Sequence, residues 1–155
     1  MKTRALASLI ATVLVVFCLG CAGPAQTVAP LNWETSLPKA IATAQSTARP
    51  ILVVVGATWC PSCRRLKAET LDHRASRAQL DGFVLLSVDV DESPALAERF
   101  GTGLLPTLVI LDRDGTVLLA NVGYQERVEF ARFLEQGEAL ASAGGARVLD
   151  AAGMP

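Results

Sequence analysis

The sequence predicts an α/β domain whose central mixed β-sheet, of about four strands, is flanked by helices. Two patterns indicate this fold class. Short, uninterrupted apolar runs rich in Val, Ile and Leu are typical of strands that are buried on both faces. Between these runs lie longer segments in which apolar residues recur at helical spacing. At 155 residues the chain has room for one such domain and a leader.

The predicted elements alternate along the chain. The first helical segment spans 32–47, and Pro38 places the start of the helix itself close to Ser36 or Leu37, because proline is tolerated in the first turn. Further helices are predicted at 61–71, then, after a break at 72–74, in a second short helix that ends at Leu80, and at 94–100 and 125–141. Strands are predicted at 51–55, 83–90, 108–111 and 116–120, and a hairpin turn at 112–115 joins the last two. The closing helix carries an apolar set, namely Val128, Phe130, Ala131, Phe133, Leu134 and Leu140.

The N-terminal leader has the features of a secretory signal. Lys2 and Arg4 provide a positively charged start, and residues 5–20 form an apolar stretch without a charge. This stretch is shorter than the roughly 20 residues that a membrane-spanning helix needs, so we expect export rather than a permanent span. The cysteines of the domain would then reach an oxidising compartment.

The end of the leader, Cys18-Leu19-Gly20-Cys21-Ala22, resembles a bacterial lipobox. The resemblance implies cleavage before Cys21 and a lipid on its sulfur, although Cys18 stands where such motifs usually have leucine. Ordinary cleavage after Ala22 or Ala25 is the alternative. We therefore predict a signal peptide at 1–20, a tether at 21–31, a folded domain at 32–141 and a flexible tail at 142–155.

The segment Trp59-Cys60-Pro61-Ser62-Cys63 is the strongest chemical signal in the sequence. It lies between the predicted strand 51–55 and the predicted helix 61–71, which places Cys60 at a helix N-terminus. Unpaired backbone N–H groups and the helix dipole stabilise a thiolate there, so we expect the pKa of Cys60 to lie below that of a free cysteine. Arg64, one turn further on, either supports the thiolate or is an ordinary solvated charge. Two cysteines at this spacing can form a disulfide, and the pattern predicts a redox-active dithiol.

Three other roles occur for cysteine pairs at this spacing, namely a zinc site, haem attachment and a structural disulfide. A zinc site needs about four ligands, and the further candidates are His73, expected at the surface, and two cysteines of the leader. Haem attachment requires a histidine directly after the second cysteine, where the chain has Arg64. A structural disulfide would close a very small loop and would stabilise the fold little. The residues favour redox chemistry.

The order of predicted elements around the cysteine pair is similar to that of the thioredoxin superfamily. The matching stretches are Ala57-Thr58-Trp59-Cys60-Pro61-Ser62-Cys63, Val88-Asp89-Val90-Asp91, Gly103-Leu104-Leu105-Pro106-Thr107 and Gly123-Tyr124. Within the superfamily, the helix opening at Trp33 and the run 63–70 most resemble the C-terminal domain of the disulfide reductase DsbD and small exported thioredoxin-like lipoproteins. The resemblance covers about 32–140 and implies a thioredoxin fold.

The helix position and the resemblance together assign roles to individual residues. Cys60 would attack a partner's sulfur, and Cys63, expected to be buried one turn into the helix, would resolve the mixed disulfide. Pro106 would follow a cis peptide bond, and Leu105 would turn its backbone toward the sulfurs to pair with an extended substrate. Trp59 would border the site, although a packing role is equally consistent with its residue type.

Three positions depart from the family pattern. Thioredoxins carry a buried acid six residues before the first cysteine, where this chain has Val54, and often a lysine at the position of Ser87. The DsbD-like domain has a glutamate where this chain has Lys67. The missing acid bears on proton transfer to and from Cys63, and Glu69 could replace it only if its helix were turned favourably.

From these residues and the resemblance we expect a lipid-anchored thiol–disulfide oxidoreductase, exported to the bacterial periplasm or cell envelope and acting on client proteins in the reducing direction. It would be a monomer whose only redox centre is its cysteine pair, with no metal or other cofactor, and a membrane electron donor is a further expected partner. Nucleic-acid binding is not expected, since no basic cluster exceeds Arg64-Arg65-Lys67. The alternative is a thioredoxin-fold binding module or assembly chaperone whose cysteines are incidental or hold a metal such as copper.

Overall fold

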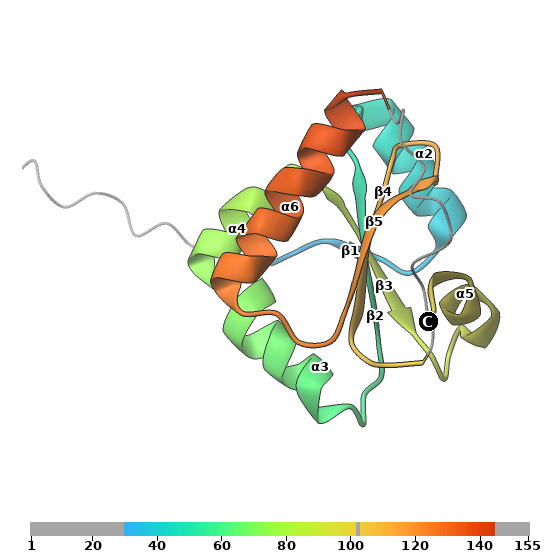
Figure 1. Cartoon of the computed structure of the whole chain (residues 1–155). Helices are drawn as coiled ribbons and strands as arrows, with labels where there is room; N and C mark the ends of the chain where they lie inside the picture. The colour runs from blue at the N-terminus through green and yellow to red at the C-terminus, as the bar shows by residue number, and fades with distance from the viewer. Residues whose placement is uncertain (1–29, 102, 145–155) are drawn as a thin grey trace, which may run out of the picture.

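The computed structural model describes residues 30–101 and 103–144, which form a five-stranded mixed sheet between two layers of helices (Figure 1). The strands are β1 (Trp33–Glu34), β2 (Ile51–Gly56), β3 (Val84–Asp89), β4 (Thr107–Leu111) and β5 (Val117–Val122). The helices are α2 (Leu37–Thr47), α3 (Pro61–Leu66), α4 (Arg74–Leu80), α5 (Pro94–Phe100) and α6 (Arg127–Ser142), and a π-helical turn η1 (Lys67–Leu71) continues α3. The predicted α/β fold class, with a mixed sheet and flanking helices, is confirmed.

Strand β2 lies at the centre of the sheet, whose order is β1-β3-β2-β4-β5. It pairs in parallel with β3 and antiparallel with β4. β1 joins β3 in parallel, and β5 joins β4 as the predicted hairpin. Asp112 Oδ1 closes the hairpin turn by accepting hydrogen bonds from the backbone N–H groups of Asp114 and Thr116.

The segment 32–36, which the sequence placed in the first helical segment but ahead of the start of the helix itself, is not helical. Its residues Trp33–Glu34 form β1 and pair with β3 at the edge of the sheet, which adds a fifth strand to the four expected. Helix α2 begins at Leu37 with Pro38 in its first turn, where the sequence placed it. The helix cannot extend further toward the N-terminus, because the ring of Pro38 would then clash with the carbonyl of Glu34.

The side chains of β2 point alternately into two core clusters, because successive residues of a strand face opposite sides of the sheet. Ile51, Val53 and Val55 pack against residues of α2 and α5. Leu52 packs on the other side against residues of α3, α4 and α6, among them Phe130. Figure 1 shows these two helix layers on opposite faces of the sheet. The uninterrupted apolar run of β2 is therefore explained by burial of both its faces.

Helix α6 packs through one apolar stripe. Phe130, Phe133 and Leu134 are buried at helical spacing, but Val128, expected on the same stripe, is 64% exposed. Val128 precedes Phe130 by two residues, which turns its side chain about 200° away around the helix. The prediction for Val128 was therefore wrong.

Most of the predicted leader lies outside the described residues. This applies to the signal peptide 1–20, to Cys21 and to the tether up to residue 29. Ser142, expected in the tail, is the last residue of α6, and the tail beyond Gly144 again lies outside the described residues. Across 30–101 and 103–144, no helix is long and apolar enough to cross a membrane.

Candidate redox site

The cysteine pair lies where β2 passes into α3. Cys60 is the N-cap of α3 and Pro61 is its first residue, a position where the missing N–H of proline leaves no helical hydrogen bond unmade. The backbone N–H of Cys63 donates a hydrogen bond to Cys60 Sγ at 3.2 Å. The sulfur of Cys60 therefore occupies the place where the start of a helix stabilises negative charge, as the sequence predicted.

Cys60 and Cys63 are joined by a disulfide, with their Cα atoms 5.3 Å apart. Their burial is the reverse of what was expected. Cys60 is 3% exposed, whereas Cys63, predicted to be the buried cysteine, is partly exposed. Gly56 at the end of β2 contributes to this, since a Cβ added there would lie 3.3 Å from Cys63 Sγ. Without that carbon, space remains open beside the sulfur.

Ser62 connects the cysteine pair to the loop that precedes β4. The Leu105–Pro106 peptide bond in this loop is cis, as expected. Ser62 Oγ donates a hydrogen bond to the carbonyl oxygen of Leu105 at 3.0 Å and lies 3.3 Å from Cys60 Sγ. Sequence reasoning missed this role, because a serine between two cysteines gives no sign of a partner in a distant loop.

The proline loop is also held by the turn that follows β5. The backbone N–H of Gly123 donates to the carbonyl oxygen of Pro106 at 2.7 Å. Gly123 has a φ of 95°, a left-handed conformation that favours glycine. The glycine at 123 is therefore needed for the turn that fixes Pro106 near the disulfide.

Two large apolar side chains are exposed on the segments that form the site. Trp59 is 61% exposed and Leu104 is 69% exposed. Trp59 Nε1 donates to Asp91 Oδ2 at 2.7 Å, which fixes the indole ring while its face stays open to solvent. Of the two interpretations of Trp59, a residue bordering the site agrees better with this exposure than a packing residue. Leu104 was missed, because an exposed loop leucine looks like a core residue in the sequence.

The neighbouring basic residues have partners other than the sulfurs. Arg64 Nη1 donates to the carbonyl oxygen of Thr58 at 3.0 Å, and Lys67 Nζ pairs with Asp72 at 2.7 Å. His73 caps α4, where its Nδ1 accepts a hydrogen bond from a backbone N–H two residues on. Arg64 thus braces the loop before Cys60. Within the described part of the chain, no group of three or more His, Cys, Asp or Glu side chains is placed to hold a metal ion.

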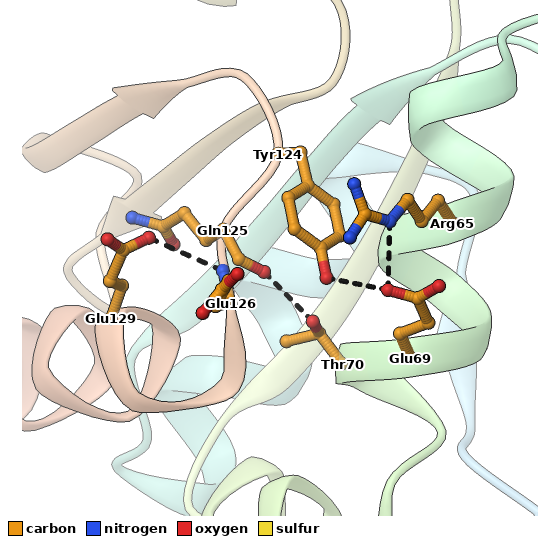
Figure 2. A network of polar contacts seen from close by, with 7 residues as sticks. All are labelled: Arg65, Glu69, Thr70, Tyr124, Gln125, Glu126 and Glu129. Carbon is orange, nitrogen blue, oxygen red and sulfur yellow. Dashed lines mark hydrogen bonds and ion pairs between the residues drawn. The ribbon is translucent and has the colours of Figure 1, made fainter.

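Glu69, considered as a substitute for the missing acid, faces other partners. Figure 2 shows Tyr124 Oη donating to Glu69 Oε2 at 2.8 Å and Arg65 Nε donating to the same oxygen at 2.9 Å. The guanidinium carbon of Arg65 lies 4.1 Å from the centroid of the Tyr124 ring. The hydrogen bond from Tyr124, followed by that from Arg65, holds the pKa of Glu69 below its ordinary value. Glu69 is therefore engaged on the surface and does not serve Cys63.

The end of the cysteine helix is fastened to the start of α6 beside this network. Thr70 is fully buried and its Oγ1 donates to the carbonyl oxygen of Gln125 at 2.9 Å (Figure 2). Glu126 and Glu129 form a capping box that begins α6 directly after this contact. The helix that carries Cys63 is thus anchored at the end away from the disulfide.

The positions of the missing acid and lysine are neighbours in the sheet, since Val54 of β2 pairs with Ser87 of β3. Both residues line a cavity of about 470 Å³ that Cys63 also lines. The chain therefore presents an apolar side chain and a hydroxyl next to Cys63, where thioredoxins have charged groups. The departure leaves Cys63 without an acid at position 54 but with open space beside it.

A disulfide that caps a helix, next to a cis-proline loop and on a mixed sheet between two helix layers, defines the class of thioredoxin-like thiol–disulfide proteins. The comparison with known proteins leads to the same class. A family model described as a thioredoxin-like domain matches residues 37–138, and the chain belongs to this family.

Individual thioredoxins resemble the chain in sequence and in structure. The thioredoxin of Chlamydia muridarum is 31% identical over 86 residues, which cover 56% of this chain and 80% of the relative. The solution structure of a thioredoxin from Thermus thermophilus has a TM-score of 0.66 and 30% identity, and the match covers 74% of this chain and 92% of that one.

The resemblance to DsbD is also supported. The thiol:disulfide interchange protein DsbD of Yersinia pestis is 27% identical over 103 residues, which cover 63% of this chain and 17% of that protein. The C-terminal domain of DsbD from Neisseria meningitidis, in its reduced form, has a TM-score of 0.57 and 25% identity, with 65% of this chain and 93% of that one covered. The resemblance thus extends to one part of a much longer protein.

Proposed function

We propose that this protein exchanges disulfides with exported client proteins through Cys60 and Cys63, in the reducing direction. The observation that carries the proposal is the position of Cys60 Sγ, which caps α3, accepts the N–H of Cys63 at 3.2 Å and is bonded to the sulfur of Cys63. A stabilised thiolate with a second thiol one turn away is what disulfide exchange requires.

In the proposed cycle, the Cys60 thiolate of the reduced protein attacks one sulfur of a client disulfide, and the other client sulfur leaves as a thiolate. Cys63 then loses its proton and attacks Cys60 Sγ, which releases the second client sulfur. The client gains two electrons and takes up two protons, and the protein is left with the Cys60–Cys63 disulfide. A membrane electron donor would return the pair to the dithiol.

An extended client segment would bind beside the proline loop. The carbonyl oxygen of Leu105, which accepts the hydrogen bond of Ser62, is a backbone group that an added strand could also use. The exposed side chains of Trp59 and Leu104 would supply apolar contact on either side of the client's sulfur. Pro106, buried beneath the loop, would keep this backbone next to the disulfide.

The proposed location is the bacterial cell envelope or periplasm, with a lipid on Cys21. It is supported by the charged start, the apolar stretch 5–20 and the Gly20-Cys21 pair of the leader. The reducing direction is supported by the likeness to the C-terminal domain of the thiol:disulfide interchange protein DsbD. We propose that the protein acts as a monomer with its cysteine pair as the only redox centre.

The test is to trap the mixed disulfide in cells that express the full chain. Cys63→Ser should accumulate a covalent complex with a client protein through Cys60, because nothing remains to displace the client. Cys60→Ser should accumulate no protein complex. Identification of the trapped partner names the client, and the wild-type redox state in cells gives the direction, mostly dithiol for a reductant.

Equal trapping by both variants would show that the roles of Cys60 and Cys63 are wrongly assigned. No complex from either variant, combined with failure of the purified protein to accelerate the reduction of insulin by dithiothreitol, would refute the redox function and favour the binding-module alternative. A mostly disulfide state in cells would reverse the proposed direction.

A further inference from the structure

Cys63 can be approached from solvent by a route that does not pass the proline loop. The cavity of about 470 Å³ beside Val54 and Ser87 is lined by Cys63, whereas Cys60 and Leu105 are not among its lining residues. Cys60 is 3% exposed, whereas Cys63 is partly exposed, so Cys63 is the more accessible residue of the pair. A small molecule in this cavity could therefore reach Cys63 without contacting Cys60 or the proline loop.

The residues that line this cavity favour an uncharged, apolar ligand. Trp33, Val54, Leu71 and Val88 contribute apolar surface from three strands and the end of the cysteine helix. The two basic residues of the lining are already engaged, Arg64 by the Thr58 carbonyl and Lys67 by the carboxylate of Asp72. The lining also holds the carboxylate of Asp89, whose Oδ1 accepts the backbone N–H of Asp91. An anionic ligand would therefore lose its hydration there, face this carboxylate and gain no cationic partner that is not already in use.

We propose that this cavity binds a small, uncharged, apolar thiol, or the disulfide formed from it, and that this molecule exchanges directly with Cys63. The inference rests on the redox function proposed above and adds a second class of substrate to it. Client proteins react at Cys60 beside the proline loop, and small thiols react at Cys63 through the cavity.

The step is an ordinary thiol–disulfide exchange. The thiolate of the small molecule attacks Cys63 Sγ, the bond between Cys63 and Cys60 breaks, and Cys60 leaves as a thiolate that accepts the N–H of Cys63. A second molecule of the thiol attacks the small-molecule sulfur of the mixed disulfide, and Cys63 leaves. Two thiols lose two electrons and become one disulfide, while the protein gains two electrons and both thiol protons.

The direction of attack follows from the sulfur that leaves. Exchange is faster when the departing thiolate is the more stable one. Attack at Cys63 expels the thiolate of Cys60, which is stabilised because its sulfur caps α3. Attack at Cys60 would instead expel the thiolate of Cys63, which does not cap the helix. Access and leaving-group stability therefore both select Cys63 for a small nucleophile.

The experiment compares two small thiols on the oxidised full-length protein, benzyl mercaptan as the uncharged probe and 2-mercaptoethanesulfonate as the anionic one. Each rate is divided by the rate of the same thiol with free cystine, which removes differences in intrinsic nucleophilicity. The normalised rate should be higher for benzyl mercaptan by about tenfold, because its ring is buried in the cavity. After an acid quench, peptide mass mapping should place the benzylthio group on Cys63. Equal normalised rates, or an adduct on Cys60, would overturn the inference.

Two variants that narrow the cavity provide a second measurement. Gly56→Ala places a methyl group 3.3 Å from Cys63 Sγ, and Ser87→Leu narrows the cavity from β3 should Gly56→Ala fail to fold. Each should slow the benzyl mercaptan reaction by about tenfold. Ala120→Val, on the exposed face of β5, adds apolar volume away from the cavity and should leave the rate unchanged. An unchanged rate in both narrowing variants would overturn the inference.

Failure of this inference is distinguishable from failure of the redox function. A protein whose Cys63→Ser variant traps clients, but whose disulfide shows no preference for benzyl mercaptan, retains the proposed function and loses the cavity site. A protein that shows neither behaviour loses both. Client trapping in the Cys63→Ser background should also be unaffected by Ser87→Leu, since that first step occurs at Cys60.

Discussion

Replacing Ser62 by alanine should destabilise the thiolate form of Cys60 relative to the thiol, while both cysteines stay in place. Ser62 Oγ has a single proton, which it donates to the carbonyl oxygen of Leu105 at 3.0 Å, and it lies 3.3 Å from Cys60 Sγ. When the disulfide is reduced and Cys60 becomes a thiolate, the same proton can turn to the charged sulfur, because hydrogen bonds to charged groups are stronger than neutral ones.

The size of the effect follows from the exchange of one hydrogen bond for another. A hydrogen bond to a charged group contributes about 1.5–3 kcal/mol, and a neutral one about 0.5–1.5 kcal/mol. Turning from Leu105 to Cys60 therefore favours the thiolate by about 1 kcal/mol. Ser62→Ala should raise the pKa of Cys60 accordingly, and at a pH below that pKa the thiolate population should fall about fivefold.

The assay is the ultraviolet absorbance of the thiolate during a pH titration in the Cys63→Ser background. Any other cysteine is present both with and without the Ser62→Ala substitution in this background, so the difference between the two titration curves reports the pKa of Cys60. Ser62→Thr keeps the hydroxyl and should titrate like the parent protein. The reasoning is refuted if Ser62→Ala leaves the titration unchanged, or if Ser62→Thr shifts it as far as alanine does.

Three further predictions concern other parts of the chain. Val54→Asp places a carboxylate in the cavity beside Cys63 and should speed resolution of the mixed disulfide by about tenfold in single-turnover client release; Val54→Asn is its control, and no change with Asp would show that water carries the proton. Glu69 has its pKa held below the ordinary 4.5 by Tyr124, so its contribution to stability is complete above that pH and is lost as the pH falls through the lower, folded value. Urea midpoints of wild type and Glu69→Gln should therefore converge in acid, and a constant gap would contradict this. Mass spectrometry of the mature protein should find a lipid on an N-terminal Cys21, and an unmodified N-terminus further along would exclude it.

The centre of the fold could be predicted because its signals are local. The apolar run of β2 and the helix that follows place Cys60 at a helix start without reference to any other segment. β1 could not be predicted in this way, since two residues have no period of their own and become a strand only by pairing with β3. The sequence around Trp33 was therefore placed in the helical segment 32–47, and no strand was predicted there.

The residues of the site could be predicted only where their role depends on neighbours in the sequence. The hydrogen bond from Ser62 to Leu105 spans 43 positions and depends on how the proline loop meets α3. The exposure of Cys63 depends on the missing side chain at Gly56 and on the cavity that Val54 and Ser87 line beside it. Sequence patterns do not show where space is left open in the folded protein. For this reason Cys63 was predicted to be the buried cysteine, whereas the structure buries Cys60.

The central place of β2 also bears on how the protein folds. The β4–β5 hairpin joins strands separated by a short turn, whereas β2 must find β3 and β4 across intervening helices. Closing such long loops is the slow part of folding. Cys60 follows β2 and Leu105 precedes β4, so the two halves of the site meet only when these strands pair. A newly made chain therefore gains its site no earlier than the pairing of β2 with β4, which confines exchange at the loop to molecules whose central strands have paired.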